Sequence, residues 1–193
     1  NFELSYFELV NKVLMRGYYT NNRNGFTYSL IGETLKFSLY ENEFPLLTSR
    51  KYNYAGVFGE FAALVRGPKK LADFVEQGCP YWAKWAEDDL SLNLDYGNAW
   101  LDFNGVNQLE WLVNEIKTNP TSRRLIVSGW RPDHVINNKL SLPCCHYSYQ
   151  FIVRDDTLNM IWIQRSADLM LGVPADAILA SLWVIMLANE VGL

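Results

Sequence analysis

The segment LPCCHYSYQF, residues 142–151, places two thiols beside an imidazole and is the first candidate for chemistry. A free cysteine such as Cys145 is more often a small buried hydrophobe than a nucleophile, so residue type alone decides nothing. Zinc is disfavoured, because Cys144, Cys145 and His146 lack tetrahedral ligand spacing and no second Cys/His pair follows. A hydrolase dyad of Cys145 and His146 is disfavoured because neighbours on a strand point to opposite faces. A cysteine hydrolase that uses His134 is the remaining form of that alternative.

Three further motifs accompany this segment in order along the chain. They are EFPLLTSRK at 43–51, NPTSRR at 119–124 and QRSADLMLGVP at 164–174. Together with the cysteine segment they resemble the thymidylate synthase family and its relatives, the nucleotide hydroxymethylases, from about residue 23 to residue 193. One such motif is weak support, whereas four in order are highly specific. The resemblance implies a thymidylate-synthase-like α+β fold and transfer of a one-carbon unit to C5 of a pyrimidine deoxynucleoside monophosphate.

The chemistry implied by the resemblance explains the residue types. C5 of a pyrimidine is a poor nucleophile, but a thiolate that adds at C6 loads electron density onto C5, which then attacks a one-carbon electrophile. Cys145 matches the nucleophile, and Arg165 is the nearby guanidinium that favours the thiolate over the thiol. The same motif implies that Arg165 and Ser166 contact the substrate phosphate.

Three other arginines match phosphate-binding residues of the family. Arg23 lies in the loop NNRNG, where a solvated loop charge is the alternative. Arg123 and Arg124 match a pair that reaches the partner subunit's phosphate across a two-fold interface, which implies an obligate homodimer formed through the sheet. Paired guanidinium groups suit a phosphate because their rigid forks make bidentate, charge-assisted bonds. Surface salt bridges are the alternative for this pair.

A carboxylate and three aromatic residues match positions around the reacting ring. Glu60, in GEFAALVRG, matches a catalytic Glu that orders water and moves protons, a task that burial beside a substrate assists by raising the pKa. Trp82 and Trp85 match aromatics on the folate side of the pocket, and Tyr96 matches a Tyr near the reacting bases. Core packing is the alternative for these three. For His146 we expect a structural hydrogen bond.

One departure from the family pattern concerns the residue that reads the base. The family has an Asn that accepts from N3-H of uracil and donates to O4, whereas LGVPAD places Asp176 there. A carboxyl group accepts from the N4 amino group of cytosine and, when protonated, donates to N3. Deoxycytidylate hydroxymethylases carry Asp at this position and share an Arg-Pro, here Arg131-Pro132. We therefore expect dCMP as the substrate; the alternative is that Asp176 pairs with a local cation.

The donor and the product follow from the same resemblance. Asp168, in RSAD, matches a residue that binds the pterin of 5,10-methylenetetrahydrofolate, the expected donor, and no metal is expected. Hydroxymethylation of dCMP is favoured because Asp176 and Arg131-Pro132 occur together in that branch. Methylation of dCMP, methylation or hydroxymethylation of dUMP, and an inactive nucleotide-binding relative remain alternatives. Ser166 favours deoxyribose only weakly.

Composition and charge indicate that the partner is a small molecule. The chain of 193 residues has a formal net charge of -4, which argues against broad nucleic-acid binding. Its three cysteines cannot form an even disulfide framework, which favours the cytoplasm, or the host cytoplasm for a viral protein. The apolar run 177–188 is expected to be a buried helix too short to span a bilayer. No signal-like segment follows Asn1, so we expect no export and no membrane partner.

Hydrophobic periodicity predicts the elements that position these residues. Helices are expected at 2–14 (ended by Gly17), 53–66, 69–77, 106–117 and 177–188. Strands are expected at 125–130, 146–153 and 158–164, and β-forming residues around Gly32 predict two strands within Thr27 to Leu39. We expect one catalytic domain over residues 1–193, with helices packed on a mixed or antiparallel sheet.

The family pattern also includes a ribose-binding Asp-x-His-x-Tyr segment and a closing C-terminal tail. Both follow the position of Leu193, and the sequence above contains neither. The expectation is that the pocket needs them to be complete.

Overall fold

The computed structural model describes residues 1–22, 25–40 and 43–193. Its helices are α1 (Phe2–Arg16), α2 (Tyr54–Leu64), α3 (Leu71–Val75), the 3-10 helix η2 (Tyr81–Trp85), α4 (Asn98–Leu101), α5 (Gln108–Thr118), α6 (Pro132–Ile136) and α7 (Gly172–Val191). Its strands are β1 (Tyr18–Asn22), β2 (Gly25–Ser29), β3 (Ile126–Ser128), β4 (His146–Arg154) and β5 (Thr157–Gln164). The fold is α+β, as expected.

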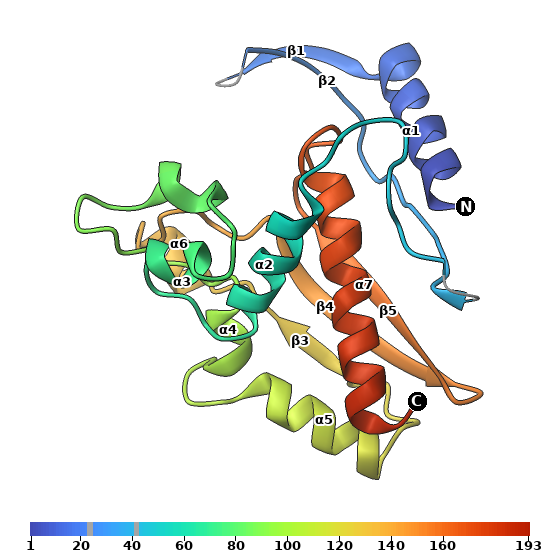
Figure 1. Ribbon diagram of the computed structural model, residues 1–193, viewed down its shortest axis with the longest axis vertical. Coiled ribbons are helices and arrows are strands. Elements are labelled where there is room, and N and C mark those ends of the chain that lie inside the picture. Colours follow the sequence, from blue (N-terminus) through green and yellow to red (C-terminus); the bar gives the residue numbers. More distant parts are fainter. Residues whose placement is uncertain (23–24, 41–42) are drawn as a thin grey trace.

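The sheet that carries the cysteine has the order β3-β4-β5, and both of its pairings are antiparallel. Tyr149 pairs with Val127 on one side and with Trp162 on the other, so these three side chains share one face. Helix α7 lies across this face, beside α2, and α5 packs at the end near β3 (Figure 1). The opposite face carries Ile161 and Ile163, which are exposed.

Aromatic side chains fill the space between the sheet and α7. Trp183 of α7 packs on Trp100 and Tyr149 with ring centroids 4.3 and 4.6 Å apart. Tyr149 is fully buried and also contacts the ring of Trp162 at 4.9 Å. Large rings bury much apolar area, so this cluster fixes the helix on the sheet.

Helix α7 confirms the expected helix 177–188 but is longer, at 20 residues. The expectation that the helix is too short to span a membrane is therefore wrong. By length and composition alone, α7 is long and apolar enough to cross a membrane. Its role here follows from packing instead. Ile178, Leu179 and Trp183 lie in the core against the sheet and α2.

Most of the other expected elements are confirmed within a few residues. The helices at 2–14, 53–66, 69–77 and 106–117 and the three sheet strands all occur. The two strands expected within 27–39 are wrong: the hairpin pairs β1 with β2, and residues 30–39 are irregular. The short helices α4, α6 and η2 were missed, because four or five residues carry too little periodicity to be recognised.

Helix α1 braces the motif at 164–174. Asn1 caps the helix by accepting from the backbone N–H of Glu3 at 2.9 Å. Tyr6 is buried in a second cluster with Phe2, Leu47 and Ala177, and its hydroxyl donates to the carbonyl of Leu169 at 2.9 Å. The N-terminal helix thus fixes the loop that precedes α7.

Gly97, directly before α4, lies in close contact with α2, and a substitution there tests this packing. Its φ is +72°, and a Cβ there would lie 2.0 Å from the carbonyl oxygen of Leu64. Gly78 has a similar φ of +81° but nothing within 4 Å of a Cβ. We expect Gly78→Ala to cost about 1 kcal/mol from backbone strain, and Gly97→Ala to cost at least about 2 kcal/mol more because α2 must shift. Urea denaturation measures both; equal costs would contradict the close contact.

Candidate active site

Cys145 lies directly before β4, and Arg165 lies directly after β5. Because the two strands are paired antiparallel, these two residues meet at the same end of the sheet. The backbone N–H of Arg165 donates to the carbonyl of Cys145 at 2.9 Å. Sheet pairing therefore brings Cys145 and Arg165 together from motifs twenty residues apart.

The guanidinium of Arg165 is held by the cysteine segment itself. Its Nε donates to the carbonyl of Cys144 at 2.7 Å and its Nη2 to the carbonyl of Pro143 at 3.0 Å. Nη2 also lies 3.9 Å from Sγ of Cys145. The positive charge of Arg165 is therefore held in place next to the Cys145 sulfur.

Tyr96 supports Cys145 from the opposite side. The Tyr96 side chain is buried, and its hydroxyl accepts a hydrogen bond from the backbone N–H of Cys145. Burial and the nearby thiols raise the pKa of Tyr96 well above its usual value, so this hydroxyl stays protonated at neutral pH. It retains a proton that can be donated to a bound molecule.

Glu60 of α2 joins this group through Trp82. The indole Nε1 of Trp82 donates to Oε1 of Glu60 at 2.9 Å, and the Trp82 and Tyr96 rings meet edge to face at 5.5 Å. Burial raises the pKa of Glu60 to about 7, against the opposing effect of this hydrogen bond. A carboxyl group with such a pKa can both accept and donate protons at neutral pH.

Asp176, in the second turn of α7, is the other carboxyl group of the site. Gln164, the last residue of β5, donates from Nε2 to Oδ2 of Asp176 at 2.7 Å. Burial raises the pKa of Asp176 to about 7, and the charge of Glu60 adds to the rise while the Gln164 bond opposes it. Sequence analysis missed Gln164; its place directly before Arg165 in the QRSAD motif was the available signal.

These contacts assemble one site from five separate segments. Two of the segments are the residue before β4, Cys145, and the residue after β5, Arg165. The others are the segment before α4 with Tyr96, helix α2 with Glu60 and helix α7 with Asp176 (Figure 1). The arrangement combines a thiol, a fixed cation and two carboxyl groups that titrate near neutrality. It is suited to adding sulfur to a polarised ring while protons are moved on that ring.

The predicted phosphate residues are in different places. Ser166 is exposed next to Arg165, whereas Arg23 lies outside the described residues. Arg123 and Arg124 are exposed before β3 and form no ion pair with any residue the structure describes. The neighbouring Leu125 accepts a hydrogen bond at its carbonyl from the N–H of Phe151. Phe151 is six residues along β4 from Cys145, which corresponds to roughly 20 Å at the spacing of residues in a strand. The arginine pair is therefore too far away to serve the Cys145 of its own chain.

The predicted folate residues differ in accessibility. Trp82 is only 5% exposed and stacks on Phe74 at 5.0 Å, so its ring face is covered. Trp85 is partly exposed, with its ring 5.3 Å from that of Trp82 and the Lys84 ammonium 3.9 Å from its ring centre. Asp168 is exposed, although one of its oxygens accepts from the N–H groups of Met170 and Leu171 at 2.9 Å. An indole and a free carboxylate oxygen fit an aromatic, amino-bearing pterin.

The remaining thiols and imidazoles lie outside this group. Burial raises the pKa of Cys79 to about 12 and that of Cys144 above its ordinary value, so both stay as thiols. His146 is buried, with its pKa lowered by burial to about 3, and its Nδ1 lies 2.7 Å from the hydroxyl of Tyr149. His134 contacts Asp95. Among the described residues no cluster of three His, Cys, Asp or Glu could hold a metal ion.

Comparison with known proteins identifies the family of the chain. The family model for thymidylate synthase matches residues 4–193 of the chain. A thymidylate synthase from Mycoplasma genitalium is 34% identical, in an alignment that covers 96% of this chain and 74% of that relative. The chain belongs to the thymidylate synthase family. It is thus a one-carbon transferase of the family that uses 5,10-methylenetetrahydrofolate as donor and a pyrimidine nucleoside monophosphate as acceptor.

The raised pKa of Glu60 predicts a pH-dependent contribution to stability. Between about pH 4.5 and pH 7 the folded state binds the Glu60 proton more tightly than the unfolded state, so the free energy of unfolding falls as pH rises. The difference between the wild type and Glu60→Gln should fall by on the order of 2 kcal/mol over this window. Urea denaturation at several pH values measures it.

Exposed Glu8→Gln is the matched control and should give a difference that does not change with pH. A Glu60→Gln difference that is constant from pH 4.5 to pH 7 would show that Glu60 ionises normally in the folded protein.

Proposed function

We propose that this enzyme converts dCMP to 5-hydroxymethyl-dCMP, with 5,10-methylenetetrahydrofolate as the one-carbon donor. The observation that carries the choice of base is the Asp176 carboxyl group. Gln164 occupies its Oδ2, which leaves Oδ1 for the substrate, and its pKa of about 7 keeps a proton available at neutral pH. A protonated carboxyl group donates a hydrogen bond to N3 of cytosine, which is an acceptor. It cannot donate to N3 of uracil, because that nitrogen carries a hydrogen.

Substrate binding begins with the phosphate. Arg165 and Ser166 hold it from the end of β5, and we assign Arg23 and the partner subunit's arginine pair to the same phosphate. The pyrimidine then lies over Cys145 with its N3 edge toward Asp176. A mismatched uracil leaves a buried polar group unpaired, at about 1 to 3 kcal/mol for each unmade bond.

Covalent addition activates the ring. The Cys145 thiolate forms a bond to C6, the electron pair of the C5–C6 bond moves into the ring, and Asp176 delivers its proton to N3 so that no net charge accumulates. The folate, bound beside Trp85 and Asp168, supplies the methylene group that C5 attacks. Loss of the C5 proton, with departure of tetrahydrofolate from the transferred carbon, leaves an exocyclic methylene while the Cys145 sulfur is still bonded to C6. Water adds to this methylene, and the sulfur then leaves C6 as the thiolate, which restores the C5–C6 double bond and gives the hydroxymethyl group. Glu60 orders that water and carries the protons.

A homodimer fits the surface of the sheet. Ile126, Ile161 and Ile163 are 45, 47 and 40% exposed on the face that α7 does not cover, and each is large and apolar. Pairing two such faces would bury these side chains. It would also give Arg123 and Arg124 a site to serve, since their own Cys145 is too far away. We place the dimer in the cytoplasm, where the free thiols of Cys79, Cys144 and Cys145 stay reduced.

A second candidate is methylation of dUMP. The 34% identical relative is named a thymidylate synthase, and much of this chain resembles it. Asp176 is the position that separates the two candidate substrates. A carboxylate there accepts from N3-H of uracil, whereas a protonated carboxyl group donates to N3 of cytosine.

Turnover of the two nucleotides tests the substrate directly. With methylenetetrahydrofolate we expect turnover of dCMP, a product heavier by one CH2O unit in mass spectrometry, and roughly 10- to 100-fold weaker kcat/KM for dUMP. Asp176→Asn should reverse the preference. Cys145→Ser should remove both activities, because a hydroxyl is a far weaker nucleophile. Conversion of dUMP alone, or a methylated product, would refute the proposal.

Mixed dimers test the arginine pair. Cys145→Ala and the double variant Arg123→Ala/Arg124→Ala should each be inactive alone. After exchange of subunits, one site in each mixed dimer has an intact Cys145 and receives intact arginines from the other chain. Activity should return to about one quarter of wild type for equal amounts, since half of the dimers carry one competent site each. If activity does not return, the pair does not act in the partner's site.

A further inference from the structure

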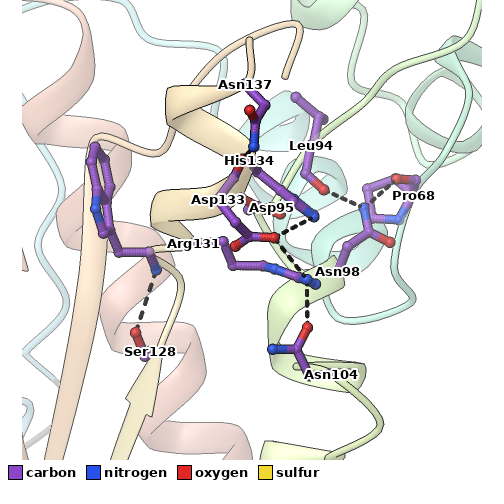
Figure 2. A network of polar contacts seen from close by, with 11 residues as sticks. Pro68, Leu94, Asp95, Asn98, Asn104, Ser128, Arg131, Asp133, His134 and Asn137 are labelled. Carbon is purple, nitrogen blue, oxygen red and sulfur yellow. Dashed lines mark hydrogen bonds and ion pairs between the residues drawn. The ribbon is translucent and has the colours of Figure 1, made fainter. Parts of the chain in front are cut away.

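Asp95, which is buried, and His134, whose side chain is 23% exposed, form a polar pair that nothing in the proposed reaction uses. Nδ1 of His134 donates to Oδ1 of Asp95 at 2.8 Å, and Asp95 is only 3% exposed. Figure 2 shows the pair bridging helix α6 and the segment that leads to α4. Its second carboxyl oxygen, Oδ2, is buried with no hydrogen-bond partner among the described residues. His134 is therefore the main polar support of Asp95.

The segment that carries Asp95 is tied to the cysteine segment at both ends. At one end the N–H of Ser141 donates to the carbonyl of Asn93 at 2.9 Å, and the N–H of Asn93 donates to Oγ of Ser141 at 3.1 Å. At the other end the N–H of Cys145 donates to the hydroxyl of Tyr96. Residues 93–96 are thus hydrogen-bonded to residues 141–145 at both ends, and Asp95 lies between these two contacts.

Helix α6 is anchored at a second point. Nη2 of Arg131 donates to Oδ1 of Asn104 at 2.6 Å and lies 3.7 Å from Oδ2 of Asp133 (Figure 2). The Arg131 guanidinium also stacks over the ring of Phe103 at 5.3 Å. The Arg131-Pro132 step therefore fixes the start of α6, so His134 is presented to Asp95 from a rigid element.

We propose that His134 is a positioning residue for Cys145, acting through Asp95 and Tyr96. Its bond to Asp95 holds residues 93–96 in place, and Tyr96 in turn holds the Cys145 backbone so that Sγ remains beside Arg165. The inference rests on the proposed function, in which Cys145 is the nucleophile.

The energetics favour a geometric role over a purely stabilising one. Burial raises the pKa of Asp95 above its ordinary value, against the effect of the His134 bond. A buried ionisable pair is commonly no more stabilising than an apolar pair of similar size, whereas removal of one partner leaves a costly unpaired group. Small displacements of a nucleophile, by contrast, lower reaction rates strongly.

The reactivity of Cys145 tests the proposal without any substrate. The rate of alkylation by iodoacetamide at pH 7, read at Cys145 by mass spectrometry, should fall about fivefold to tenfold in His134→Leu because Sγ moves away from Arg165. His134→Asn places an amide nitrogen where Nδ1 lies and should retain at least half of the wild-type rate. Ile136→Ala, 76% exposed on the same helix, is the control and should change nothing.

A double variant separates position from stability. Asp95→Leu/His134→Leu replaces the pair with two apolar side chains, so its thermal unfolding midpoint should lie above that of His134→Leu. Its kcat for dCMP should stay about tenfold below wild type, with KM within threefold. If alkylation and kcat instead recover together with stability, or if His134→Leu alkylates at the wild-type rate, the pair is merely structural and the proposal is overturned. A wild type that acts on neither nucleotide refutes the proposed function, while the alkylation rates still decide the role of His134.

Discussion

The antiparallel pairing of β4 with β5 is the interaction on which the site depends. It brings the residue before one strand and the residue after the other to the same end of the sheet, where the N–H of Arg165 bonds the carbonyl of Cys145. The guanidinium then folds back onto the carbonyls of Pro143 and Cys144. A side chain held by the segment that carries the sulfur moves with it, so the guanidinium and the sulfur keep their relative position.

The same sheet positions the two carboxyl groups of the site. Its covered face supports α7, which carries Asp176 to the end of β5, and α2 brings Glu60 beside it. Each carboxyl group has a pKa of about 7 because each is buried, and each is oriented by one neutral donor, Gln164 or Trp82. Neutral donors orient a carboxyl group without adding a positive charge, which would hold it ionised.

Particular residues show how far sequence could predict this molecule. The helix and strands around the cysteine were predicted because their apolar residues follow clear periods of 3.6 and 2. The strands expected within 27–39 were wrong because residue type favoured extended structure there, while pairing partners existed only for β1 with β2. The length of α7 was underestimated because its first five residues include Gly172, Pro174 and Asp176, which carry little helical signal.

The sequence by itself determined the family and predicted Cys145 as the nucleophile, because the order and spacing of four motifs are preserved along the chain. Only the tertiary structure decided which of them act together within one chain. It placed Gln164 on Asp176, Trp82 on Glu60 and His134 on Asp95, and it set Arg123 and Arg124 at the far end of the sheet. Those relations depend on strand register and helix packing, which bring together residues that no spacing along the chain connects.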